Sequence, residues 1–282
     1  MPVNTPAQFD FDDLLRLYQE WDRNDAGRPY EHISEILERA KAMHKAAHQI
    51  KTNGNGDHGQ SWRAWKGKNF EKLIRVIVEE EIAHLNRAHG LTLAAAHDTA
   101  LERARLSVEL DRVKRNLLVD YGSYGSHLPD ADLIIYDRIS TQVLCILSCK
   151  VTMRERIAQT AYWKLKLRKS AVTRHVRVAL VTPDEDEDLI IRPEQGRVKK
   201  NYAIASVDLD TTYVLHTALQ PTDRIKSFSR FAHDIKSWTR GGGVDARRPP
   251  QPGKEACRAV SARARCAKGI APRRQKRRIA LC

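Results

Sequence analysis

An acid and a lysine at the ends of two short apolar segments could together hydrolyse a phosphodiester. Asp130 precedes the apolar run 131–136, and Lys150 follows the apolar run 142–149. If the chain forms a hairpin about Ser140, these two residues are equidistant from the turn and lie directly opposite each other. A carboxylate can hold Mg²⁺ against a phosphate, and a lysine can orient water and stabilise developing charge. An ordinary strand-end aspartate and a solvated lysine would show the same spacing.

The segment after the lysine combines residue types that can read base edges. Ser148 precedes the lysine by two positions, and Arg154, Glu155 and Arg156 follow it at an expected helix start. Arginine can donate to guanine O6 and N7, and glutamate can accept from cytosine N4, so this trio suits G·C pairs in the major groove. The alternative is structural, because Thr152-x-x-Glu155 is a capping-box pattern in which the glutamate only caps the helix.

A strand that ends in Ser-x-Lys, followed by Arg-Glu-Arg at a helix start, resembles type II restriction endonucleases of the PD-(D/E)XK superfamily. The similarity is to the BsaWI-like branch, which reads CC and GG dinucleotides. It covers roughly residues 62–170, and Gly67-Lys68-Asn69-Phe70-Glu71 is similar to the glutamate-bearing helix of these nucleases. The roles that the resemblance implies are metal binding for Asp130, catalysis for Lys150, an auxiliary acid near the metal for Glu71, and base recognition for Arg154, Glu155 and Arg156.

One position departs from the family pattern and leaves the second metal-binding acid open. Ser148 stands where the familiar form has an acid. Relatives with serine there draw a replacement from the following helix, thirteen or fourteen residues after the lysine, and those positions hold Trp163 and Lys164 here. The second carboxylate therefore either comes from elsewhere in the chain or is absent, since one carboxylate, the carbonyl of Cys149 and water molecules could also hold magnesium.

Glu71 is the first candidate for this second carboxylate, although it could also be a solvated helix residue. Glu79, Glu80 or Glu81 on the same helix are less favoured substitutes, and Asp132 is a further possibility because it shares a strand face with Asp130. The backbone carbonyl of Cys149 and water molecules could complete the shell of a magnesium ion.

Most of the net charge lies at the C-terminal end. Residues 241–282 hold twelve Lys and Arg against Asp245 and Glu255, so +10 of the net +14 belongs to this segment. A basic segment without apolar periodicity is predicted to be disordered, and it could bind phosphates without sequence preference. The basic charge is therefore weak support for a specific nucleic-acid site.

Hydrophobic periodicity predicts helices first and then a mixed sheet. Helices are expected at 11–21, 33–47, 62–89, 97–116, 154–169 and 227–238, and strands at 131–136, 142–149, 176–182 and 203–209. The acidic stretch 184–188 is expected to be a solvated loop. This order predicts an α/β (α+β) fold with a mixed β-sheet core flanked by helices, which the resemblance makes restriction-endonuclease-like. The expected organisation is an N-terminal helical region at 1–60, a nuclease core at 61–240 and the basic tail at 241–282.

Other features exclude several classes. No run of about 18 apolar residues could span a bilayer, and the N-terminus lacks a secretory pattern, so we expect a reducing compartment and no membrane. Five cysteines without Cys-x-x-Cys spacing argue against a disulfide framework and a zinc–thiolate site. The pairs His44 with His48 and His84 with His89 have no matching third ligand in the sequence, so metal is not expected there.

The leading hypothesis is a type II restriction endonuclease that cuts double-stranded DNA with Mg²⁺ at a G·C-rich palindrome containing CCGG, in a bacterial cytoplasm. Cutting both strands of a palindrome calls for two active sites, so we expect a homodimer, which could pair into a tetramer. One alternative is a repair or junction nuclease of the same fold, which needs no base readers. Another is a non-cleaving DNA-binding module with a degenerate nuclease core, which Ser148 suggests.

Overall fold

Alternating apolar residues in two neighbouring strands build a hydrophobic core on each face of a sheet. Leu133, Ile135 and Leu147 pack into one buried cluster, whereas Ile134 and Ile146 pack into another. Neighbours along a strand point to opposite faces, so a strand that is apolar throughout must be covered on both sides. The computed structural model describes residues 8–24, 29–153, 156–190 and 198–241.

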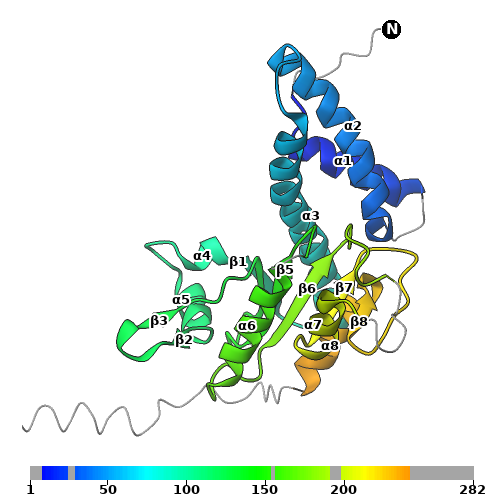
Figure 1. Cartoon of the computed structure of the whole chain (residues 1–282). Coiled ribbons are helices and arrows are strands. Elements are labelled where there is room, and N and C mark those ends of the chain that lie inside the picture. The colour runs from blue at the N-terminus through cyan, green and yellow to red at the C-terminus, as the bar shows by residue number, and fades with distance from the viewer. Residues whose placement is uncertain (1–7, 25–28, 154–155, 191–197, 242–282) are drawn as a thin grey trace, which may run out of the picture. The chain divides into compact units, whose positions relative to one another are not determined.

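The described strands form a six-stranded mixed sheet in the order β1-β4-β5-β6-β7-β8 (Figure 1). They are β1 (Leu93–His97), β4 (Leu133–Asp137), β5 (Val143–Cys149), β6 (Arg177–Thr182), β7 (Thr211–Val214) and β8 (Ile225–Ser227). The pairs β1 with β4 and β4 with β5 are antiparallel, and every later pair is parallel. Strands β2 (Val119–Asp120) and β3 (Ser126–His127) form a separate small ribbon.

Helices cover both faces of the sheet. They are α1 (Phe11–Asn24), α2 (Ile33–Thr52), α3 (His58–His89), α4 (Asp98–Leu101), α5 (Val108–Arg115), α6 (Arg156–Arg168), α7 (Lys200–Val207) and α8 (Phe231–Gly241), with 3₁₀ turns η1 (Pro29–His32), η2 (Gly122–Tyr124) and η3 (Phe228–Arg230). Helices α3 and α8 contact each other and β5, whereas α6 and α7 contact each other and pack on β6 and β7. Helices α1 and α2 pack on α3, so the N-terminal helices and the sheet share one hydrophobic cluster.

Helix α3 is well delimited by its own sequence. The side chain of Asp57 accepts a hydrogen bond from the backbone N–H of Gln60 and caps the start. At the other end Gly90 adopts a left-handed φ of 62°, which glycine tolerates without strain. Between them Phe70 and Leu73 are fully buried, and burial of such side chains contributes about 1.5–3 kcal/mol each. The helix therefore holds a defined position over the sheet.

The predicted α/β class, with a mixed sheet flanked by helices, is confirmed. Two local predictions are wrong: the expected strand 203–209 lies mostly in helix α7, which ends at Val207, and 97–116 holds the end of β1 and two short helices instead of one long helix. Strands β1, β7 and β8 were not predicted. The alanines of β1 favour helix in isolation, but pairing with β4 overrides that preference.

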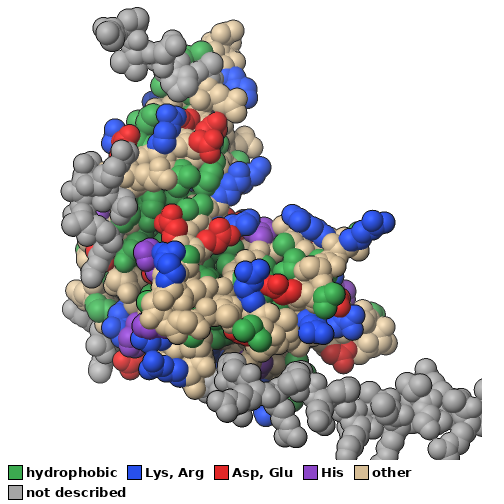
Figure 2. Space-filling model, turned by 180° about the vertical axis from the view of Figure 1, so that it is seen from behind, with side chains coloured by type: hydrophobic (Ala, Val, Ile, Leu, Met, Phe, Trp, Pro, Cys, Tyr) green, Lys and Arg blue, Asp and Glu red, His purple; other side chains and the backbone are tan. Residues whose placement is uncertain are grey.

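Charge is mixed over the described surface. Figure 2 shows Lys and Arg side chains interspersed with acidic and apolar ones on one face of the molecule. No helix among the described residues is long and apolar enough to cross a membrane.

The predicted boundary between the N-terminal helical region and the nuclease core, between residues 60 and 61, falls within the first turn of α3 and stays a prediction.

One acid of the loop at 184–188 is buried, whereas Glu185 and Glu187 are exposed as expected for a solvated loop. Asp184 is only 1% exposed, and its carboxylate accepts hydrogen bonds from the backbone N–H groups of Asp188, Leu189 and Ile190, at 3.1, 2.7 and 3.0 Å. One side chain thus satisfies three backbone donors of the loop. The acid at this position is structural.

Replacement of Asp184 by Ala should destabilise the fold by about 2–4 kcal/mol, because buried N–H groups would lose their acceptor. Asp184→Asn keeps one acceptor oxygen and should cost less. Denaturant unfolding checks this, with Asp223→Ala in an exposed loop as the control, expected to stay within about 0.5 kcal/mol of the parent. Equal effects of the Asp184 and Asp223 substitutions would contradict the structural role.

Candidate active site

The hairpin of β4 and β5 has the predicted register from Leu133 to Ile135, shifts by one residue at Tyr136, and ends earlier than expected. Leu133 pairs with Leu147, and Ile135 pairs with Cys145, as a turn near Ser140 requires. Strand β4 begins only at Leu133, however, so the ladder does not extend back as far as Asp130.

Asp132, and not Asp130, faces Lys150. The lysine Nζ donates to Asp132 Oδ2 at 2.8 Å and to Oδ1 at 3.1 Å, and the backbone N–H of Cys149 donates to Oδ2 at 2.5 Å. Asp132 is 8% exposed, whereas Asp130 is exposed and accepts a hydrogen bond from Gln159. The expected contact between Asp130 and Lys150 is therefore wrong, because β4 begins only at Leu133 and the lysine Nζ is held by Asp132.

Lys150 itself is placed by the parallel pairing of β5 with β6. Its backbone N–H donates to the carbonyl of Val181 at 3.0 Å. Backbone groups of successive strand residues point to opposite sides, so the N–H and the carbonyl of Cys149 point toward the Asp132 side. That direction agrees with the hydrogen bond from Cys149 to Asp132.

Glu71 reaches the same region from α3. Its Oε1 lies 2.5 Å from His97 Nε2, and the other ring nitrogen of His97 lies 2.6 Å from Asp98 Oδ1. His97 is the last residue of β1 and pairs with Leu133, the first residue of β4. The imidazole thus stands between two carboxylates beside the start of β4.

A cavity of about 550 Å³ joins these elements. Its lining includes the cations Arg63, Lys66, Lys68, Lys150 and Arg156, the acids Glu71 and Glu185, and the wall residues Cys149, Val151 and Thr152. Five cations against two acids leave the lining with a net positive charge, which attracts phosphate groups. Glu185 and Asp186 bound this side of the cavity. Glu185 pairs with Lys66 at 2.5 Å, and Asp186 accepts a hydrogen bond from the backbone N–H of Met153.

Burial and neighbouring charge shift two pKa values here. The pKa of Asp98 is raised, chiefly by burial and further by the charge of Asp132, against the opposing effects of the Thr99 N–H and His97. Full burial raises the pKa of the Cys149 thiol well above its usual value, and the charges of Asp132 and Glu71 add to this while Lys150 opposes it.

The donor set fits magnesium. Among the described residues no three His, Cys, Asp or Glu side chains form a ready-made ligand set. Magnesium needs no such cage, because it is usually bound by one or two carboxylates, water and substrate phosphate. The carboxylates of Asp132 and Glu71 and the carbonyl of Cys149 are oxygen donors of this kind.

The predicted base readers are only partly described. Arg156 is the first residue of α6, is exposed and lines the cavity with Lys150. Arg154 and Glu155 lie outside the described residues. The two positions where the resemblance led us to look for a replacement acid hold Trp163 and Lys164, and both have structural roles. Lys164 is 3% exposed and paired with Asp210, and Trp163 packs on the core.

Sequence reasoning missed His97 and Asp98, and it ranked Asp132 only as a further possibility. The sequence did contain a signal for the face of α3 that lines the cavity. Arg63, Gly67 and Glu71 recur at four-residue spacing and would lie on one helix face. No signal pointed to His97, because its place depends on a strand pairing that was not predicted.

A mixed sheet whose strand end carries an Asp–Lys pair, with the lysine lining a basic cavity, is an arrangement suited to metal-assisted phosphodiester hydrolysis. Residues 109–238 match the sequence profile described as "BsaWI restriction endonuclease type 2". That match covers the part of the chain that holds the hairpin, and the chain belongs to the type II restriction endonucleases, as predicted.

Two relatives agree with this assignment. The chain is 34% identical over 214 residues to a putative type II restriction enzyme, MjaVIP, of Methanocaldococcus jannaschii, covering 72% of this chain and 92% of that one. It is 32% identical over 186 residues to a probable type II restriction enzyme, HpyAORF263P, of Helicobacter pylori, covering 63% and 92%. A solved complex of restriction endonuclease PspGI with substrate DNA aligns with a TM-score of 0.49 and 14% identity, over 82% of this chain and 93% of that one.

The raised pKa of Cys149 predicts an unreactive thiol. In a protein with Cys257, Cys266 and Cys282 replaced by Ser, the buried Cys145 and Cys149 should stay protonated and shielded near pH 8. Ellman's reagent should therefore label them only after unfolding. Rapid labelling of the Cys149 thiol in the folded protein would show that this wall of the cavity is open.

Proposed function

We propose that this restriction endonuclease cuts double-stranded DNA at a G·C-rich palindrome containing CCGG, with Mg²⁺ as its cofactor. The observation that carries the proposal is the basic cavity at the end of β5, where Glu71, Lys150 and Arg156 meet in front of Asp132. Elements from three parts of the chain, α3, the hairpin and α6, converge there.

Asp132, Glu71 and the carbonyl of Cys149 are the groups that would hold the magnesium ion. The metal role first predicted for Asp130 passes to Asp132, because of these two acids it is Asp132 that contacts the lysine. When bound, the ion polarises the scissile phosphate and favours ionisation of a water molecule. Lys150 would orient that water and stabilise charge on the phosphate, and His97 would hold Glu71 in place.

The remaining cations of the cavity are suited to hold the DNA backbone. Arg63 and Lys68 come from the same helix as Glu71, so phosphate binding and the acid are placed by one rigid element. Lys66 is already paired with Glu185 and would contribute less. These contacts would position DNA without reading its sequence.

Recognition of CCGG rests on the family resemblance and on the chemistry of Arg154, Glu155 and Arg156. The position of Arg156 supports it, since a reader at the first residue of α6 lies on the same cavity as the catalytic lysine. A wrong base would then disturb the geometry of cleavage as well as binding. A homodimer, which could pair into a tetramer, would bring two such sites to a palindrome, and a bacterial cytoplasm would be its place of action.

Digestion of methylation-free genomic DNA with Mg²⁺, followed by sequencing of the ends, tests the proposal. Discrete ends that share a CCGG-containing sequence are expected. Asp132→Ala and Lys150→Ala should each lower kcat/KM by about 10³-fold or more, whereas Asp130→Ala, a matched acid two residues away, should stay within about tenfold. Ends without a shared sequence would favour a repair nuclease, and binding without cutting would favour a degenerate module.

Arg156→Ala should relax specificity. A lost bidentate contact to guanine costs about 1–3 kcal/mol, so the ratio of kcat/KM between the preferred site and a singly substituted site should fall roughly 5- to 150-fold. Arg168→Ala, at the exposed end of the same helix, is the control and should leave the ratio unchanged. A uniform loss on all sites would instead assign Arg156 to a phosphate.

A further inference from the structure

Three imidazoles gather between α2 and α3, away from the basic cavity. His44 and His48 lie one turn apart on α2, and His58 is the first residue of α3. The ring centroids are 5.3 Å apart for His44 and His58, 5.7 Å for His48 and His58, and 6.1 Å for His44 and His48. Helix packing thus supplies the third ring that the sequence did not reveal for the pair on α2.

Two ring nitrogens of this group are buried without a hydrogen-bond partner among the described residues. His44 is only 7% exposed and its Nδ1 is unpaired, and the Nε2 atom of His58 is buried and unpaired as well. Unpaired buried nitrogens are unfavourable and rare in native proteins, and a bound ion can satisfy them. Two such atoms in adjacent rings point to a shared ligand.

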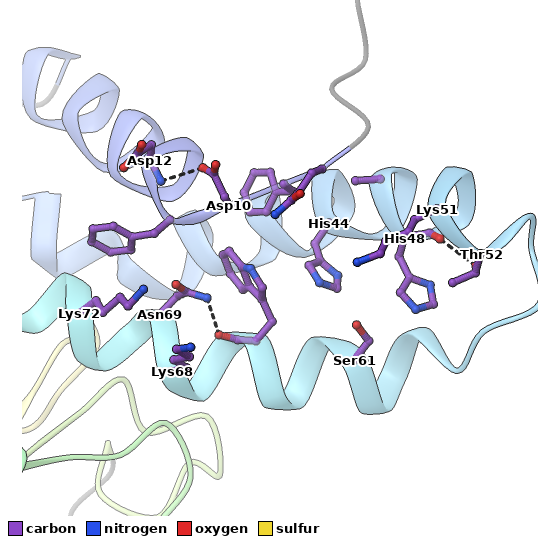
Figure 3. A pocket seen from close by; sticks show the side chains of 15 residues that line it. Asp10, Asp12, His44, His48, Lys51, Thr52, Ser61, Lys68, Asn69 and Lys72 are labelled. Atoms are coloured by element: carbon purple, nitrogen blue, oxygen red, sulfur yellow. Dashed lines mark hydrogen bonds between the residues drawn. The ribbon is translucent and has the colours of Figure 1, made fainter.

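The cluster opens onto a cavity of about 570 Å³ lined by His44 and His48. Figure 3 shows both rings projecting from α2 into the space in front of α3. On the other side the chain passes close to His48, since a Cβ placed on Gly56 would lie 2.5 Å from the ring atom Cε1. The absence of a side chain at Gly56 therefore leaves room for the imidazole.

Burial and neighbouring charge lower the pKa of two of these rings, those of His44 and His58, which favours their neutral form. Burial lowers the pKa of His44, and the charges of His58 and His48 lower it further. Burial also lowers the pKa of His58, followed by His48, Lys45 and Lys41, with Asp57 opposing. Neutral imidazole is the form that binds transition metals.

Aromatic packing is the competing explanation. His44 also lies 5.4 Å from the rings of Trp62 and Trp65. No three donor side chains of the described residues converge on one point as they stand, so metal binding requires rotation of the rings. Rings that share one zinc ion lie roughly 5 Å apart between centroids, given Zn–N distances of about 2.0–2.1 Å. The observed spacings are therefore close to those of the bound state.

We propose that His44, His48 and His58 rotate to bind one Zn²⁺, or another transition ion that prefers imidazole, and thereby fasten α2 to α3. Two histidines at i and i+4 supply ligands from one helix face, and the third comes from the facing helix. A water molecule would take the fourth position of a tetrahedral site. The site is separate from the oxygen donors at the end of β5 and does not depend on cleavage.

Metal binding by the full chain tests this. In saturating Mg²⁺, which fills oxygen sites, Zn²⁺ should bind with a stoichiometry of one per chain by calorimetry and raise Tm by roughly 3 °C or more. Co²⁺ should give the strong visible bands of tetrahedral coordination. His44→Gln/His48→Gln/His58→Gln should abolish the Tm shift and the bands, whereas the control His84→Gln/His89→Gln, on exposed positions of α3, should keep both.

Unchanged zinc stoichiometry and Co²⁺ bands in the triple variant would overturn the proposal, since binding would then lie elsewhere. Absence of saturable Zn²⁺ or Co²⁺ binding by the parent protein would also overturn it and leave aromatic packing as the explanation. If circular dichroism shows that the triple variant does not fold, the single variant His58→Gln takes its place in the test, because it removes one ligand at a partly exposed helix start. That variant should lose the tetrahedral bands and bind Zn²⁺ at least tenfold more weakly.

Discussion

A buried carboxylate needs partners, and the partners of Asp132 organise the end of the sheet. Removing this charge from water without compensation would cost several kcal/mol. Lys150 and the N–H of Cys149 provide the compensation, which requires β5 to end where it does and the lysine to turn toward β4. The basic cavity, the nearby Glu71 and the start of α6 all take their places around this pair.

The hairpin shows how far a local pattern determines geometry. Two apolar runs and a polar turn were enough to predict the register, because a one-residue slip would exchange the two faces of the sheet. The residue at which the pairing of the two strands stops could not be predicted from these patterns. It depends on the partners available to each acid, so the prediction chose Asp130 where the structure uses Asp132.

Contacts between distant segments were the least predictable part. Glu71 was proposed from a family resemblance, yet its neighbour His97 belongs to β1, an alanine-containing strand that reads as helix by itself. The same limit applies to the histidines of α2, whose third neighbour lies across a loop on α3. Helix periodicity identifies the faces that must be buried, but it does not say which two faces meet.

Helix α3 links the two candidate sites, and their donor chemistry keeps them distinct. The oxygen groups of Asp132, Glu71 and Cys149 suit a hard ion such as magnesium, whereas the imidazoles of α2 and α3 suit a borderline ion such as zinc. Each set therefore discriminates against the other's metal by ligand type. A zinc ion that fastens α2 to α3 would stiffen the helix that carries Glu71, so stability of the helical region and placement of the acid would share one structural support.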